Sequence, residues 1–127
     1  MADLYRHIVL ANGLAINFYD HTTRYYGDFH LVKLDLVCEI DLASLAGKIN
    51  VSMEELTRFL GERVSYHRVL EQMGVPGTEI ERVKERLVAD FEQHSIAYFS
   101  TSSFPEKLVL AELRKARRRL GLPLASN

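Results

Sequence analysis

The sequence predicts an α+β protein: an antiparallel sheet of three or four strands, with about three helices packed on one face. Two patterns predict this class. The first third of the chain alternates apolar and polar residues with a period of two, as strands do. The remainder places apolar residues at helical spacing behind helix-capping sequences. We expect the order β-β-β-α-β-α-α in a single domain over residues 1–127.

The first two strands are predicted to form a hairpin around Asn12-Gly13. This pair suits a two-residue type I′ turn, in which both central residues need a positive φ. A two-residue loop would place Val9 opposite Ile16 and His7 opposite Phe18. These four residues would then share one apolar face of the sheet.

Residues 29–42 are predicted to form the third strand, because apolar residues occupy every second position from Val32 onward. The apolar series is Val32, Leu34, Leu36, Cys38, Ile40 and Leu42, and the charged residues between them are Lys33, Asp35, Glu39 and Asp41. We expect the apolar series to be buried and the charged residues to be exposed. A loop around Gly27 joins this strand to the second one, so the three strands form an antiparallel meander.

Capping sequences and prolines mark three helices. Ser52 and Glu55 form a capping box for the first helix, and Thr78 and Glu81 form one for the second. The second helix should bury a stripe formed by Ile80, Val83, Leu87, Phe91 and His94. The third is bracketed by Pro105 at its start and by Gly121 and Pro123 at its end, with Leu110, Leu113 and Leu120 as its apolar seam.

Residues 61–74 admit two interpretations. Gly61 can end a short first helix, after which Val64, Tyr66 and Leu70 alternate as a fourth strand. Alternatively, the helix continues with Leu60, Val64, His67 and Leu70 along one side. The β-branched and aromatic residues and the early glycine favour the strand.

Composition narrows the classes of function. Sixteen basic and seventeen acidic side chains leave a formal charge of −1, so no strong overall field attracts nucleic acid or anionic lipid. The single cysteine, Cys38, fits a reducing compartment. We see no secretory signal and no apolar stretch approaching the roughly 20 residues of a membrane span. We therefore expect a cytoplasmic protein that does not contact a membrane.

Residues 17–30, NFYDHTTRYYGDFH, hold five of the twelve aromatic side chains. We interpret this stretch as the end of a β-ribbon and as a contact surface between protein chains, because tyrosine and arginine are enriched in such surfaces. The candidate interface residues are Tyr19, Arg24, Tyr25, Tyr26 and Phe29. The same stretch contains Asp20, His21, Asp28 and His30, but it lacks the tight ligand spacing of a metal site. We expect no bound metal and no cofactor.

A second reading is a pocket between the sheet and the helices. Its polar candidates are His7, Asp20, His67 and His94. No catalytic motif accompanies these residues, so we assign no catalytic residue and favour a non-enzymatic role. The basic run RKARRRL at residues 114–120 suits the end of a helix, where cations offset the helix dipole. For that reason we do not expect nucleic-acid binding.

These observations favour a protein–protein interaction module that forms a homodimer through the aromatic ribbon or an open sheet edge. The alternative is an enzyme or small-molecule-binding protein with a pocket between sheet and helices.

Overall fold

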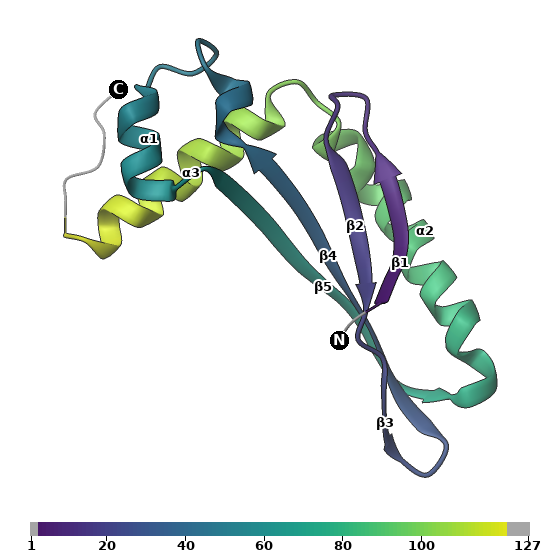
Figure 1. The fold of residues 1–127 in the computed structure, drawn as a ribbon. Helices are drawn as coiled ribbons and strands as arrows, with labels where there is room; N and C mark the ends of the chain where they lie inside the picture. The colour runs from purple at the N-terminus through teal and green to yellow at the C-terminus, as the bar shows by residue number, and fades with distance from the viewer. Residues whose placement is uncertain (1–2, 122–127) are drawn as a thin grey trace. The chain divides into compact units, whose positions relative to one another are not determined.

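The computed structural model of the protein describes residues 3–121 (Figure 1). Its strands and α-helices are, in chain order, β1 (Asp3–Val9), β2 (Ala15–Asp20), β3 (Thr23–Tyr26), β4 (Phe29–Asp41), α1 (Met53–Leu60), β5 (Arg63–Pro76), α2 (Ile80–Phe99) and α3 (Phe104–Arg119). Short 3₁₀ helices lie at Leu42–Leu45 and Gly77–Glu79. The predicted α+β class, with an antiparallel sheet and three α-helices, is confirmed.

The chain divides into two compact units, and the prediction of a single domain stays a prediction. The first unit contains the residues up to 38 together with residues 66–101, which form β1, β2, β3, α2 and most of β4 and β5. The second unit contains residues 39–65 and the residues from 102 onward, which include α1 and α3. None of the helices described has the length and apolar composition needed to cross a membrane.

The sheet has five strands in place of the three or four predicted. Strand order is β1-β2-β4-β3, in which β2 and β3 pair with successive parts of β4. Strand β5 pairs with β4 along the edge opposite β2 (Figure 1). The extra strand arises because the predicted second strand is interrupted at His21 and Thr22. There the Asp20 carboxylate accepts the backbone amide of Thr22 at 2.9 Å, which turns the chain before β3 resumes the pairing with β4.

Residues 63–76 form a strand, as the favoured interpretation predicted, and the helical alternative is wrong. The α1 helix ends at Leu60, and Gly61 follows it with φ +78°. A residue other than glycine is strained in this left-handed region, so the glycine ends the helix and releases the chain into β5.

The hairpin at Asn12-Gly13 is present, but its predicted register is wrong by one residue. The Gly13 amide donates to the Leu10 carbonyl at 3.0 Å, and Gly13 has φ +88°, so the loop has three residues. A type I turn followed by a left-handed glycine has this geometry. Ile8 consequently faces Ile16, while His7 faces Asn17 and is exposed.

The core of the first unit lies between the sheet and α2. All six predicted apolar residues of β4 and its continuation, from Val32 to Leu42, are buried. The four that belong to the first unit are Val32, Leu34, Leu36 and Cys38. They lie on the sheet face that packs on α2, where the Phe18 and Phe91 rings are in contact with 5.7 Å between their centroids. The charged residues of β4 fit the prediction only in part. Glu39 and Asp41 are exposed, but Lys33 and Asp35 are half-buried because β4 has neighbours on both sides.

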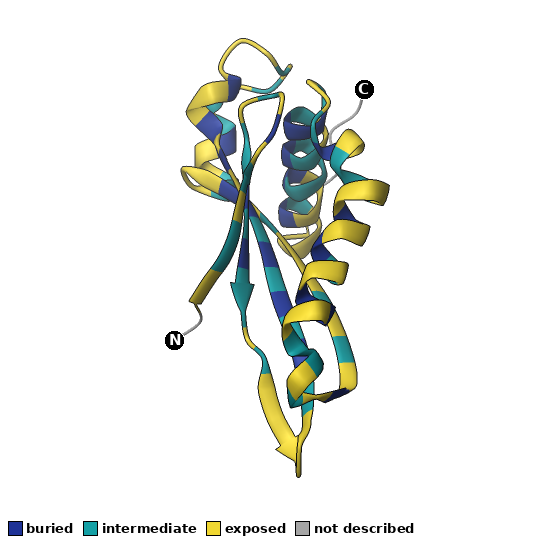
Figure 2. Ribbon diagram, turned by 90° about the vertical axis from the view of Figure 1, so that its right-hand side faces the viewer, coloured by how far each residue is buried: buried dark blue, intermediate teal, exposed yellow. Residues whose placement is uncertain are grey.

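The second helix differs from the prediction at both ends of its stripe. The expected capping box at Thr78 does not form, because residues 77–79 make a 3₁₀ turn and α2 begins at Ile80. The buried residues are Val83, Lys84, Val88, Phe91 and Phe99. His94 is exposed, so its predicted place on the buried stripe is wrong. Figure 2 shows how burial alternates along this helix.

In the second unit, Ser52 caps α1 as predicted, and its hydroxyl oxygen accepts the Glu55 amide at 3.1 Å. The apolar side of α3 is formed by Phe104, Val109, Leu113 and Ala116. Leu110 is half-buried and Leu120 is exposed, so the predicted seam is correct only at Leu113. Leu120 lies past the last helical residue, and Pro123 lies outside the described residues.

Candidate functional site

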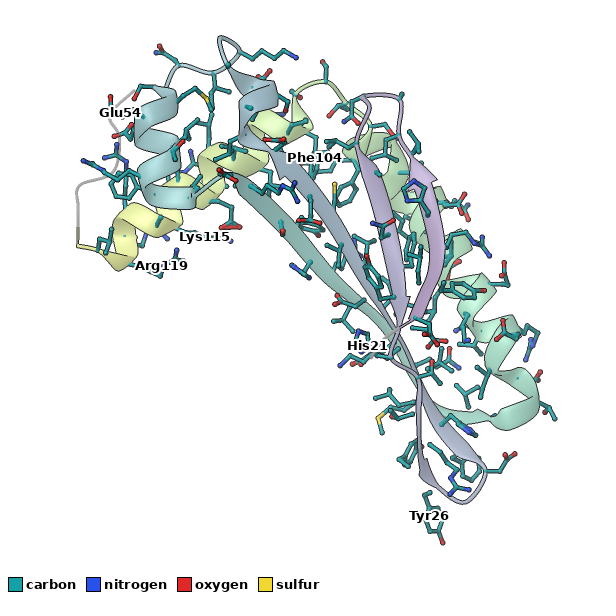
Figure 3. All side chains as sticks on the ribbon, viewed as in Figure 1. His21, Tyr26, Glu54, Phe104, Lys115 and Arg119 are labelled. Carbon is teal, nitrogen blue, oxygen red and sulfur yellow. The ribbon has the colours of Figure 1, made fainter. Side chains whose placement is uncertain are left out.

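The aromatic ribbon, residues 23–29, is formed by β3, the turn at Gly27 and the first residue of β4. Every residue in it is exposed (Figure 2). The exposed fractions of Tyr25, Tyr26 and Phe29 are 50%, 75% and 45%. Arg24 is also exposed and faces His30 across the ribbon. In Figure 3, Tyr26 lies at the very end of the ribbon and points away from the sheet.

Tyr19, the fifth interface candidate, does not belong to the ribbon. It lies on β2, is half-buried, and faces Asp35 of β4. Tyr19 therefore lies within the body of the sheet, whereas the other four candidates lie on the projecting ribbon.

The polar residues of the same stretch have separate local partners. The Asp28 carboxylate accepts the Gly77 amide at 3.2 Å, and the His30 ring lies 3.0 Å from the Asp28 carbonyl and 3.3 Å from that of Val75. These bonds hold the base of the ribbon against the end of β5. Asp20 turns toward α2, and His21 is exposed on the loop before β3 (Figure 3). In the part of the chain that the structure describes, no three His, Cys, Asp or Glu side chains are placed to hold a metal ion.

The sheet face opposite α2, which we call the open face, continues from the ribbon along the strands. Residues facing one another across antiparallel strands share a face, so Leu4, Tyr19 and Asp35 lie on the same side. The His67 ring of β5 lies 3.8 Å from the Asp35 carboxylate and extends this row.

Alternation along β5 identifies the rest of the open face. The ring of Tyr66 packs on Phe99, and Arg68 lies over the Phe91 ring, so these two residues face α2. The residues that alternate with them, His67, Val69, Glu71 and Met73, point to the other side. On that side, Val69 and Met73 have exposed fractions of 48% and 66%.

The four ligand candidates of the second reading lie apart from one another. His7 is exposed on the open face, and its ring lies 2.6 Å from the Asn17 side-chain oxygen. His67 lies beside Asp35 on β5, whereas His94 is exposed on α2. Asp20 alone turns into the space beneath α2. The structure therefore does not bring these four residues together.

Several surface hollows lie among the described residues of the second unit. Four hollows of about 460, 390, 270 and 180 Å³ are lined by residues of the second unit and by none of the four candidates. The 390 Å³ hollow is lined by Lys115, Arg118 and Arg119 of the basic run (Figure 3). Arg117 of the same run is mostly covered, because it pairs with Glu55 and lies over the Phe59 ring. The basic run is therefore only partly a solvated face.

Sequence reasoning missed a buried lysine beneath the sheet. Lys84 of α2 is 7% exposed, and its ammonium lies 2.6 Å from the Asp20 carboxylate and 2.9 Å from that of Glu81. The same ammonium lies 5.2 Å from the centre of the Tyr5 ring. We call Tyr5, Asp20, Glu81 and Lys84 the lysine cluster. The available signal was helical spacing, because Lys84 lies four residues after Ile80 and three before Leu87 and so falls on the predicted stripe.

Hydrogen bonds within the lysine cluster stabilise the charged forms of Asp20 and Lys84. Burial disfavours the charged form of Asp20, but hydrogen bonds from Lys84 and Thr22 outweigh it and lower the pKa of this carboxyl. Burial likewise opposes the charge on Lys84, yet hydrogen bonds to Asp20 and Glu81 raise its pKa. Burial and a hydrogen bond to Glu85 raise the pKa of Tyr5 to about 12. Lys84 is thus held as a protonated ammonium, which suits its ion pair with Asp20.

Comparison of the chain with protein-family models, with curated proteins and with solved structures finds no match.

Proposed function

We propose that this protein is a non-enzymatic, cytoplasmic interaction module that self-associates as a homodimer through its aromatic ribbon or an open sheet edge. The observation that carries the proposal is the exposure of Tyr25, Tyr26 and Phe29 on one projecting ribbon. Solvent-exposed patches of large apolar side chains on soluble proteins mark interaction sites.

The exposed area of the three rings is large enough for its burial to contribute substantially to the free energy of dimerisation. A fully buried aromatic side chain removes 150–250 Å² from water, so the three rings together expose roughly 350 Å². Burial of this area contributes roughly 9 kcal/mol per chain before the entropy of association is subtracted. Tyrosine combines a large apolar ring with a hydroxyl that can remain hydrated at the rim, as is common in interfaces.

The alternative is an enzyme or small-molecule-binding protein with a pocket between sheet and helices. Of its four candidates, His7 and His67 lie on the open face, Asp20 points toward α2 and pairs with Lys84, and His94 is exposed on α2. No observation specifically favours this alternative, whereas the exposed ribbon favours the interaction module.

The test is the oligomeric state of purified protein carrying Tyr25→Ser and Tyr26→Ser, measured by light scattering and sedimentation. We expect the unsubstituted protein to be a dimer and the double variant to be a monomer with an unchanged helical circular-dichroism signal. Tyr98→Ser is the matched control, because Tyr98 is 55% exposed on α2, away from the ribbon. An unsubstituted protein that is monomeric at high concentration, or a double variant that stays dimeric, would contradict the proposal.

A further inference from the structure

We infer that the dimer contact covers the whole open face of the first unit, packed face to face against the open face of a second copy. The ribbon would be one end of this interface. This inference rests on the proposed function, because it names the surface and the partner of the same self-association.

The exposed apolar side chains gather on this face. Phe29 shares the face with Asp35 by alternation along β4, and Tyr26 faces Phe29 across the ribbon. On β1, the partner of His7 is Asn17, which lies two residues from Tyr19, so Val9 points to the same side. Of the nine large apolar side chains exposed within residues 3–121, six lie on the open face: Leu4, Val9, Tyr26, Phe29, Val69 and Met73.

The area of this patch matches what one partner contributes to a dimer. Six side chains that are about half exposed, at on the order of 100 Å² each, present roughly 600 Å² of apolar surface. A standard interface buries about 800 Å² per partner. The polar residues around the apolar patch would supply the remaining area. Two antiparallel sheets that pack face to face form such an interface, with their inner side chains interdigitated.

The charges on the open face fit a second copy better than a partner of one sign. Lys33 supplies a cation, Asp35 and Glu71 supply anions, and the imidazoles of His7 and His67 lie on the same face. In a two-fold symmetric contact, each residue that meets another across the interface does so twice, so a face that carries both signs can pair its lysine with a carboxylate of its copy. The formal charge of −1 per chain leaves little repulsion between two copies.

The experiment places a carboxylate on the open face at positions that do not belong to the ribbon. Val69→Asp and Met73→Asp lie on β5 outside residues 23–29, and both positions are exposed enough for the single chain to keep its fold. Because the contact is two-fold symmetric, each substitution buries two unpaired carboxylates in the dimer. We expect the dimer Kd, measured by sedimentation, to rise at least 100-fold in each variant.

Ala97→Asp on the exposed side of α2 is the matched control and should leave the Kd within twofold. Thermal unfolding and circular dichroism report whether each variant is folded. If Tyr25→Ser with Tyr26→Ser dissociates the dimer while Val69→Asp and Met73→Asp leave it intact, the ribbon acts alone and this inference is overturned, although the proposed function stands. If the unsubstituted protein is a monomer, both fall, and the face is free for a different partner.

Discussion

Replacing Lys84 with methionine should destabilise the protein strongly at neutral pH. Methionine matches the length of the lysine stem and keeps its packing under the sheet, so the substitution removes mainly the charge. The Asp20 carboxylate would then lose its ammonium partner at 2.6 Å while its side chain remains only 21% exposed. An ionised carboxylate left unpaired in such a place is costly, since water can solvate it only in part.

The magnitude follows from the burial of the two groups. Removing one member of a fully buried ion pair costs about 3–5 kcal/mol. Asp20 retains the hydrogen bond from the Thr22 amide and some contact with solvent, so we expect a loss of about 2–3 kcal/mol. Glu81 adds little to this figure because its side chain is 75% exposed.

The loss should depend on pH in a defined direction. The folded state lowers the pKa of Asp20 below the ordinary value of 3.8, so the pair stabilises the fold above that value. This contribution is lost as the pH falls through the lowered pKa of the folded state. The difference between Lys84→Met and the unsubstituted protein should therefore be largest near neutral pH and should shrink in acid.

The assay is urea unfolding at pH 7 and at pH 3, with Asp20→Asn and the double variant completing a cycle. Asp20→Asn in the Lys84→Met background should recover at least about 1 kcal/mol, because it removes the unpaired charge. A loss below about 1 kcal/mol for Lys84→Met, or no recovery in the double variant, would refute the assignment of Lys84 and Asp20 as a buried ion pair.

Four further outcomes are expected. Ser52→Ala removes the hydroxyl that accepts the Glu55 amide and should lower the free energy of unfolding by about 1 kcal/mol in urea titrations. Gly13→Ala should cost about 1–2 kcal/mol through backbone strain alone, since φ is +88° and an added Cβ meets no neighbouring atom; an unchanged midpoint in denaturant would contradict the three-residue turn. A metal chelator should leave the melting temperature unchanged, and stoichiometric zinc in the purified protein would count against this expectation. Binding to DNA or RNA should vanish at physiological salt, whereas tight binding lost on replacing Arg117, Arg118 and Arg119 would show that the basic run is a nucleic-acid site.

Local patterns were sufficient for much of the fold. The burial of residues 32–42 at every second position follows from alternation, because a strand beside a core has only one side to bury. The Ser52 cap depends on residues three positions apart, and the strand after Gly61 depends on a local change of backbone conformation. The exposed ribbon around Tyr25 and Tyr26 was also predicted, since the short loop at Gly27 leaves its rings no core to enter.

Long-range contacts decided what the local patterns left open. Asn12-Gly13 suits both a two-residue and a three-residue hairpin loop, and in the folded chain the Asn12 amide donates to the carbonyls of Phe99 and Thr101, both at 2.8 Å. That contact with the end of α2 holds the longer loop, which moves His7 from the predicted apolar face to solvent.

The sequence by itself determined the α+β class, the buried side of β4 and the exposure of the ribbon, because each depends on residues that are neighbours along the chain. The tertiary structure alone decided the hairpin register, the separation of the four ligand candidates and the pairing of Lys84 with Asp20. Lys84 of α2 contacts Asp20 of β2 only after the helix has packed on the sheet. The residue pattern of one element contains no information about the charge that lies opposite it on the other element.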